Sequence, residues 1–248
     1  PELFTSRTEL RFTVAEPGAT FVDLTAQTVH RAVLDGVALP PEAVTPTRLQ
    51  LPHLDVGDHH LEVEASMAYQ HEGNGLHRFV DPSDDRVYLH SQFEPFDAHL
   101  VYACFDQPDL KTTFALDVTA PEEWVVVSNA RVLERPPSGA AGTWRFATTP
   151  LLSTYVTAVV AGPYVGVEDR YERPDGTGID LGWWSRRSLA EHVDPDELFE
   201  VTKQSFAAFE DLFAMHYPFG DRYDQLFVPE FSAGAMENPG CVTYTETY

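Results

Sequence analysis

The strongest constraint on the fold is a run of residues, 59–69, that reads HHLEVEASMAY and alternates between polar and apolar side chains. The apolar set is Leu61, Val63, Ala65, Met67 and Tyr69, with His60, Glu62, Glu64 and Ser66 between them. Successive side chains of a β-strand point to opposite faces, so this period of two predicts a strand that is buried on one face only. Strands of this kind are typical of antiparallel sheets.

Further short apolar runs, separated by prolines and glycines, follow one another up to about Gly166. They lie at residues 8–14, 112–118, 123–129, 143–148 and 153–164. Asp35-Gly36 lies between two more apolar runs, which predicts a two-residue hairpin turn. Many short strands at this spacing predict a sandwich-like or saddle-shaped all-β domain.

The pattern changes near Val167, where a hairpin that turns at Asp175-Gly176 precedes the only convincing long helix. Asp194 is the expected N-cap of this helix, and Pro195 occupies its first position. Residues at helical spacing predict one buried face: Leu198, Val201, Thr202, Ser205, Phe206, Phe209, Leu212 and Phe213. An apolar strand follows at 223–231. We therefore predict an all-β amino-terminal domain at 1–167 and the beginning of an α+β domain at 168–248.

The charge balance narrows the classes of partner. The chain has 16 Lys and Arg against 39 Asp and Glu, a formal charge of -23, which argues against nucleic acids and anionic membrane surfaces as partners. We find no run long enough to span a bilayer and expect no leader. Cys104 and Cys241 form no CxxC pattern and are expected to be free thiols in a reducing, cytoplasmic setting.

Familiar catalytic motifs are absent from the sequence. His71-Glu72 begins like the zinc motif HExxH, but Gly75 stands where the second histidine is needed, and the surrounding glycines predict a loop. We therefore reject a zinc site at this position. The sequence also has no nucleophile elbow and no phosphate-binding loop. Composition and spacing alone leave the chemistry open.

Two stretches are more informative. Residues 88–118 contain Gln92-x-Glu94 followed by CFDQPDLKTTF at 104–114, and residues 228–240 read VPEFSAGAMENPG. Their order and their separation of about 140 residues resemble the aminopeptidase N family of zinc metallopeptidases, which are gluzincins of the HExxH type. The resemblance covers essentially the whole chain. It implies a mainly β chain, in which an amino-terminal antiparallel β sandwich or saddle precedes the start of a thermolysin-like α+β catalytic domain.

The resemblance also implies a substrate-binding set: Gln92, Glu94, Gly234, Ala235, Met236, Glu237 and Asn238. Glu94 and Glu237 would converge on the α-ammonium group of a peptide through charge-assisted hydrogen bonds. A peptide with a blocked amino terminus would leave these carboxylates without a partner. Gly234 and Ala235 would leave room for the substrate backbone to pair along an edge strand.

Other residues of these stretches have structural interpretations or depart from the family pattern. We expect Phe105 and Phe114 to belong to the core, and Asp106 to pair with Lys111. His99 stands where family members usually carry arginine, which puts a local ion pair in doubt. Pro239 removes one backbone donor after the Gly-Ala-Met-Glu-Asn motif.

The zinc ligands of the family would lie beyond Tyr248. We therefore expect no catalytic residue and no metal site within these 248 residues. On this interpretation the chain is a fragment of a zinc aminopeptidase that acts on peptides with a free amino terminus. The fragment alone would bind no zinc and hydrolyse nothing.

Three other interpretations remain open. The first is a non-catalytic aminopeptidase-like scaffold, although an amine-binding pair such as Glu94 and Glu237 favours an enzyme. The second is a bifunctional epoxide hydrolase–aminopeptidase, which the form of the 234–238 motif favours less. The third is a β-sandwich module that binds a ligand such as a carbohydrate. The predicted helix and strand after Asp194 count against a sandwich alone.

Overall fold

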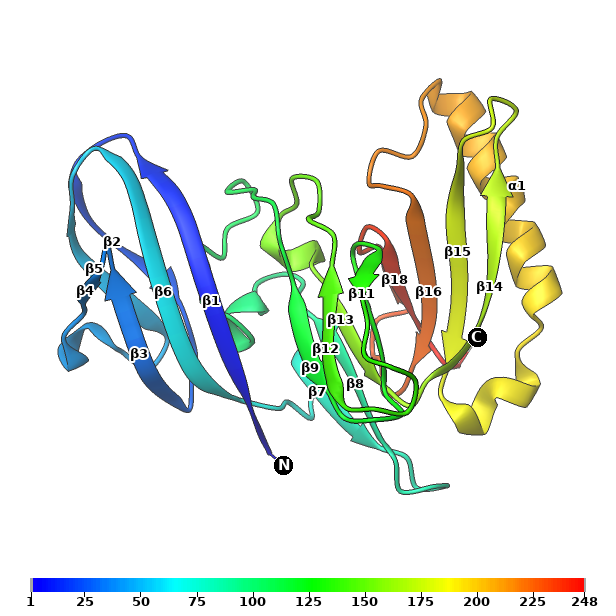
Figure 1. The fold of residues 1–248 in the computed structure, drawn as a ribbon, viewed down its shortest axis with the longest axis horizontal. Helices are drawn as coiled ribbons and strands as arrows, with labels where there is room; N and C mark the ends of the chain where they lie inside the picture. The colour runs from blue at the N-terminus through cyan, green and yellow to red at the C-terminus, as the bar shows by residue number, and fades with distance from the viewer. Residues whose placement is uncertain (1, 248) are drawn as a thin grey trace. The chain divides into compact units, whose positions relative to one another are not determined.

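A computed structural model describes residues 2–247, which form two compact units (Figure 1). The first unit contains the described residues up to His77, together with Gln92–Lys111 and Ser153–Tyr155. The second contains Arg78–Ser91, Thr112–Leu152 and the described residues from Val156 onward. The predicted mainly β fold is confirmed, with several antiparallel sheets and one α-helix among the described residues. The predicted domain boundary at residue 167 stays a prediction.

The first unit is built from two antiparallel sheets. The larger sheet has the strand order β1 (Leu3–Val14), β6 (Gly57–Ala68), β3 (Thr28–Leu34) and β4 (Val37–Ala38). The smaller pairs β2 (Gly18–Asp23) with β5 (Arg48–Leu54). The short 3-10 helices of this unit are η1 (Pro41–Ala43) and η2 (Ala98–Leu100). Asp35 and Gly36 both have positive φ between β3 and β4, which confirms the predicted hairpin turn.

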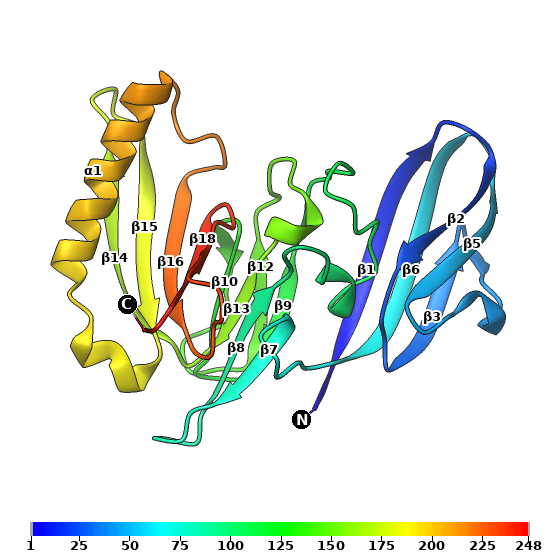
Figure 2. The same cartoon turned by 180° about the vertical axis from the view of Figure 1, so that it is seen from behind.

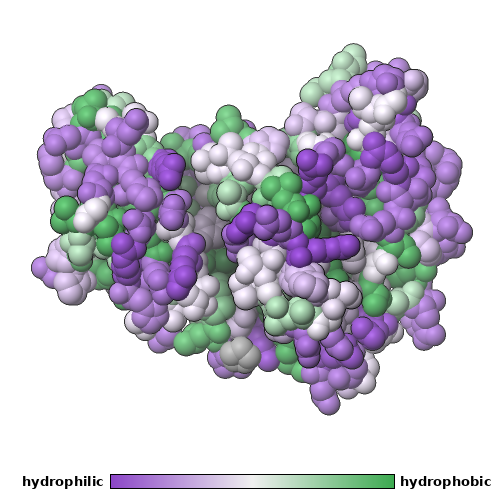
Figure 3. Space-filling model, viewed as in Figure 1, coloured by the Kyte–Doolittle hydropathy of each residue, from purple (hydrophilic) through white to green (hydrophobic). Residues whose placement is uncertain are grey.

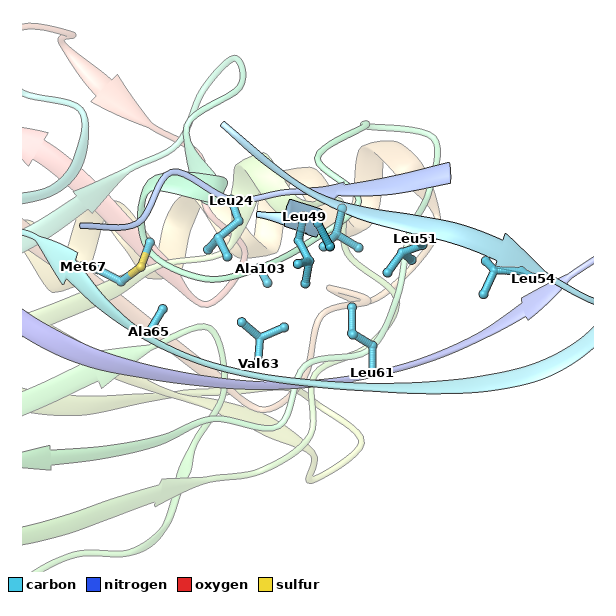
Figure 4. Packing of buried hydrophobic residues seen from close by; sticks show 11 residues of the cluster. Leu24, Leu49, Leu51, Leu54, Leu61, Val63, Ala65, Met67 and Ala103 are labelled. Atoms are coloured by element: carbon cyan, nitrogen blue, oxygen red, sulfur yellow. The ribbon is translucent and has the colours of Figure 1, made fainter. Parts of the chain in front are cut away.

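The core of the first unit lies between these two sheets. Leu61, Val63, Ala65 and Met67 of β6 are buried and belong to one cluster with Leu49 and Leu51 of β5, as Figure 4 shows. The predicted alternation along β6 is therefore confirmed. The opposite face of the larger sheet is largely hydrophilic (Figure 3) and carries cross-strand ion pairs such as Arg7–Glu64. Such pairs suit the solvated face of an antiparallel sheet.

Three further sheets follow. One has the order β10 (Val125–Ser128), β13 (Val159–Gly162), β8 (Val87–Gln92) and β7 (Gly75–Val80). A second has the order β11 (Val132–Glu134), β12 (Gly142–Phe146) and β9 (Asp117–Ala120). The third has the order β14 (Val165–Glu172), β15 (Gly178–Ser185), β16 (Arg222–Val228), β18 (Cys241–Thr245) and β17 (Ala235–Met236). The remaining 3-10 helices are η3 (Thr154–Val156) and η4 (Arg187–His192).

The five-stranded sheet is the part that positions the 234–238 motif. Its two outer pairs, β14–β15 and β17–β18, are antiparallel, whereas β15–β16 and β16–β18 are parallel. Helix α1 (Pro195–Phe213) connects β15 to β16 and lies along one face of the sheet (Figures 1 and 2). A parallel pair needs such a crossover connection. Ile179, Leu181, Trp183 and Phe199 are buried at this helix–sheet contact.

The predicted buried face of α1 is only partly right. Phe199 and Thr202 are buried and Phe206 is partly buried against the sheet, but Phe209 is 57% and Leu212 is 70% exposed. Burial is confined to the first and middle turns of the helix, at Phe199, Thr202 and Phe206, whereas the apolar residues near its carboxyl end are exposed. Within residues 2–247, no helix has the length and apolar character that crossing a membrane requires.

Two predicted strands are shorter than the sequence indicated. Of residues 112–118, only those from Asp117 onward join β9, because Thr112 forms an isolated bridge with Leu152 and the Phe114 amide donates to the Thr149 hydroxyl. Of residues 153–164, only Val159–Gly162 form a strand. In the first of these segments, long-range and side-chain hydrogen bonds replace part of the predicted ladder.

The amino-terminal cap of α1 gives a first testable prediction. The Asp194 carboxylate accepts a hydrogen bond from the Glu197 amide at 3.2 Å, as the sequence predicted. Asp194→Ala should lower the free energy of unfolding by about 1 kcal/mol, because this amide loses its partner. Asp194→Ser, which keeps a capping oxygen, is the control. Urea unfolding compares the two variants, and equal losses would show that the cap contributes nothing.

Candidate functional site

Two residues of the 234–238 motif, Ala235 and Met236, form β17, the outermost strand of the five-stranded sheet. Strand β17 pairs antiparallel with β18, with Ala235 opposite Tyr244 and Met236 opposite Thr243. The Gly234 carbonyl accepts from the Thr245 amide at 3.0 Å. Alternate residues of an antiparallel strand bond to the same neighbour, so the backbone groups of Ala235 face away from β18. They therefore face the side on which an extended peptide could add as a further strand.

The side chains of the motif alternate between buried and exposed. Met236 is 3% and Asn238 is 2% exposed, whereas Gly234, Ala235 and Glu237 are exposed. β17 ends at Met236, and the alternation of burial continues through the two residues that follow it. The two buried side chains fix the strand, while Glu237 presents its carboxylate to solvent.

A tight turn ends the motif. The Cys241 amide donates to the Asn238 carbonyl at 3.0 Å, and Gly240 has φ +74° after Pro239. Proline followed by a residue of positive φ is the pattern of a type II turn. The Gly240 amide donates to the Tyr217 hydroxyl at 2.9 Å. Burial raises the pKa of Tyr217 to about 12, so this hydroxyl stays neutral at physiological pH.

Gln92 and Glu94 lie at the end of β8 and in the loop that follows. Gln92 is buried and Glu94 is exposed. Phe93 between them is buried against Tyr102, with ring centroids 6.0 Å apart, and its carbonyl accepts from the Asp97 amide at 2.9 Å. The buried Phe93 side chain thus anchors the loop, and the Glu94 side chain is exposed to solvent.

His99 and Asp106 form the local pair that the sequence left in doubt. The Asp106 carboxylate accepts from the His99 ring nitrogen Nδ1 at 3.0 Å, from the His99 amide at 3.1 Å and from the Thr154 hydroxyl at 2.6 Å. The predicted pairing of Asp106 with Lys111 is wrong, since Lys111 is exposed and the carboxylate is fully engaged elsewhere. Burial acts to raise the pKa of Asp106, but the hydrogen bonds from His99 and Thr154 outweigh it and lower the pKa.

This lowered pKa leads to a prediction about acid stability. A carboxyl group with a lowered folded-state pKa stabilises the fold above its unfolded pKa of about 4, and loses this contribution as the pH falls below that value. Asp106→Asn should therefore lower the free energy of unfolding by about 1–3 kcal/mol at pH 7. The difference in free energy of unfolding between this variant and the unsubstituted protein should become smaller between about pH 5 and pH 3. Urea unfolding across this range measures it, and a pH-independent difference would contradict the prediction.

No metal site is formed by the residues that the structure describes. They contain no group of three or more His, Cys, Asp or Glu residues placed to hold an ion. His71 lies in a loop, as the sequence indicated.

The predicted site residues fall into two groups. Residues 234–238 lie together on and beside β17, and Gln92 and Glu94 lie together at the end of β8. The two groups belong to different compact units, so the convergence of Glu94 and Glu237 stays a prediction. Sequence reasoning missed the buried residues that hold the turn at Gly240, since Tyr217 and Asn129 contact it from distant parts of the chain. No local pattern marks such long-range contacts.

Comparisons with known proteins identify the relatives of this chain. The family model described as Peptidase M1 N-terminal domain matches residues 42–156, and the model described as Peptidase family M1 domain matches residues 197–248. Aminopeptidase N of Streptomyces lividans is 50% identical over 99% of this chain. Aminopeptidase N of Acetobacter pasteurianus is 33% identical over 77% of it, and the human protein of that name is 30% identical over 88%.

These matches define the class of the protein. The chain belongs to the M1 peptidase family. It spans 28% of the length of the Streptomyces relative, 53% of the Acetobacter relative and 24% of the human relative.

Proposed function

We propose that the chain is part of a zinc aminopeptidase that removes amino-terminal residues from peptides. In this proposal Gln92, Glu94 and residues 234–238 anchor the substrate. The observation that carries it is the outermost strand β17, which is followed directly by an exposed glutamate between two buried side chains. The identity to proteins named aminopeptidase N supports the same function.

The physical role of the site follows from its charges. A peptide substrate brings a positively charged amine, and Glu237 and Glu94 each present an exposed carboxylate. Charge-assisted hydrogen bonds to an ammonium group are stronger than neutral ones. A blocked amino terminus would desolvate the same carboxylates without pairing them, which is unfavourable. The site would therefore select free amino termini both by attraction and by rejection.

Peptide backbone binding is the second part of the proposal. The outward-facing backbone groups of Ala235 can pair with an extended substrate, and the small residues Gly234 and Ala235 leave space for it. When bound, zinc would supply Lewis-acid activation of water and of the peptide carbonyl. Its ligands would come from residues other than the described ones, and this chain's part is to hold and orient the amine.

The proposal includes partners and location. A formal charge of -23 favours peptides over nucleic acids or anionic membrane surfaces as partners. Cys104 and Cys241 are buried free thiols, which is compatible with a cytoplasmic location.

An assay with two substrates tests the function. The full-length protein should hydrolyse an aminoacyl-coumarin with a free amine and leave its N-acetyl form intact, with stoichiometric zinc by metal analysis. The 248-residue chain alone should cleave neither substrate and hold no stoichiometric zinc. Equal cleavage of both substrates by the full-length protein would contradict the amine site. Zinc with steady turnover in the 248-residue chain would contradict its proposed inactivity, and a full-length protein without turnover would favour the scaffold.

A further inference from the structure

The segment between β16 and β18 is bracketed by two prolines whose carbonyl groups are both held by buried side chains. His90, on β8, contacts the Pro229 carbonyl through its ring nitrogen Nε2 at 2.9 Å. Asn129, directly after β10, donates from Nδ2 to the Pro239 carbonyl at 2.8 Å. Proline has no amide hydrogen, so its carbonyl is the one backbone group available for such an anchor. Strand β17 lies between these two anchors.

The His90 anchor lies at the start of the segment. A carbonyl oxygen can only accept a hydrogen bond, so the geometry assigns the ring proton to Nε2. The same ring packs edge-on against Phe231, with centroids 5.7 Å apart at 89°. His90 is fully buried and pairs with Val160 in the middle of its sheet. One side chain thus holds both the backbone and the first aromatic residue of the segment.

The Asn129 anchor lies at the end of the segment. Its Nδ2 also donates to the Val156 carbonyl at 2.9 Å, and its Oδ1 accepts from the Ala158 amide at 2.7 Å. The Asn129 side chain is therefore held by hydrogen bonds to the residues that precede β13, in addition to its hydrogen bond to Pro239. The backbone of Asn129 also lies close to Gly240, because a Cβ added at Gly240 would lie 2.4 Å from the Asn129 carbonyl oxygen. Both parts of Asn129 thus fit against the turn that follows Glu237.

We infer that β8, β10 and β13 form a frame that fixes the position of Glu237, and that His90 and Asn129 are its positioning residues. This inference rests on the proposed function, since it assigns them a role in amine recognition. The two anchors are separated by one strand, β13, and so by two strand spacings of about 5 Å each. Hydrogen bonds at both ends of the segment between β16 and β18 fix the direction of its backbone as well as its distance from the sheet. Neither residue needs to touch the substrate.

Kinetics of the full-length protein test the inference. Asn129→Asp keeps the shape and the Oδ1 acceptor but replaces the Nδ2 donor to Pro239 and Val156, and His90→Leu removes the donor to Pro229. Each should lower kcat/KM for a free-amine aminoacyl-coumarin about tenfold, since a misplacement near 1 Å can cost up to about a hundredfold. His90→Gln, which carries an amide donor of similar reach, should recover most of the loss.

Neighbouring serines supply matched controls. Ser128 donates to the Ala158 carbonyl at 2.7 Å, and Ser91 accepts from the Val159 amide at 2.8 Å. Both serines are buried next to an anchor residue, but their hydrogen bonds go to Val159 of β13 and to Ala158 just before it, and not to the segment that carries Glu237. Ser128→Ala and Ser91→Ala should therefore leave kcat/KM within about twofold. A loss in these controls equal to that in the anchor variants would overturn the inference.

A double-mutant cycle separates positioning from simple destabilisation. Combined with Glu237→Ala, Asn129→Asp should cost little further activity, because the group it positions is already absent. If the losses multiply, the inference is wrong. If Asn129→Asp does not fold, the comparison of His90→Leu with His90→Gln decides the question. Turnover by the unsubstituted protein and its loss in Glu237→Ala test the proposed function separately, so the two can fail independently.

Discussion

Glu237→Ala should lower kcat/KM of the full-length protein for a free-amine substrate by about a hundredfold or more. Removing one partner of a hydrogen-bonded charge pair typically costs about 2–5 kcal/mol, and each 1.4 kcal/mol corresponds to a tenfold change in rate. The carboxylate is exposed directly after β17, and its neighbours Met236 and Asn238 are buried, so its removal should leave the strand in place. Zinc content should therefore stay unchanged. Steady-state kinetics and metal analysis measure the two quantities.

A second substitution and a matched control complete this test. Glu94→Ala should produce a loss similar to that of Glu237→Ala, because both carboxylates are proposed to hold the same ammonium group. Glu122→Ala removes the same charge from an exposed position before β10 and should leave kcat/KM unchanged. Loss of zinc in Glu237→Ala would show that the residue serves the metal site instead. Unchanged selectivity against the N-acetyl substrate would also contradict the amine role.

Gly240→Ala should destabilise the second unit by about 2–4 kcal/mol and reduce activity with it. Gly240 has φ +74°, which costs a residue with a side chain about 1 kcal/mol or more. The new Cβ would also lie 2.4 Å from the Asn129 carbonyl oxygen, so backbone must move. Overpacking of this kind typically costs a further 1–3 kcal/mol. Thermal or urea unfolding measures the loss.

Gly176 provides the control for this substitution. It has φ +85° in the β14–β15 hairpin, and a Cβ there would have no atom within 4 Å. Gly176→Ala should therefore show the backbone cost of about 1 kcal/mol without the steric cost. If both variants lose the same stability, the close approach of Asn129 to Gly240 contributes nothing.

The parts of the fold that local chemistry determines could be predicted from the sequence. The alternation from Leu61 to Met67, the turn at Asp35-Gly36 and the Asp194 cap each depend on neighbours within a few residues. The buried face of α1 depends instead on how much of the helix packs against the sheet. Phe209 has the same character and spacing as Phe206, but one is exposed and the other packs against Tyr223. That choice is made by tertiary packing and leaves no local signal.

The candidate site also has parts that the sequence predicts and parts that it does not. The motif from Gly234 to Asn238 can be recognised in the sequence, and the turn at Pro239-Gly240 is expected because proline and glycine favour turns. The anchors could not be predicted, because His90 is 139 residues from Pro229 and Asn129 is 110 residues from Pro239 in the chain. The partner of Asp106 was also missed. Lys111 is closer in sequence than His99, but the fold brings the histidine ring to the carboxylate.

Strand β17 also bears on how the protein avoids self-association. An outermost strand able to accept a peptide can in principle accept the same strand of another copy, which is a route to aggregation. Here the strand is two residues long, a charged residue follows it directly, and a proline comes two positions later. Short length, charge and proline are the usual protections of sheet edges. The same features that suit β17 to the single substrate strand proposed for it thus make it a poor template for a growing sheet.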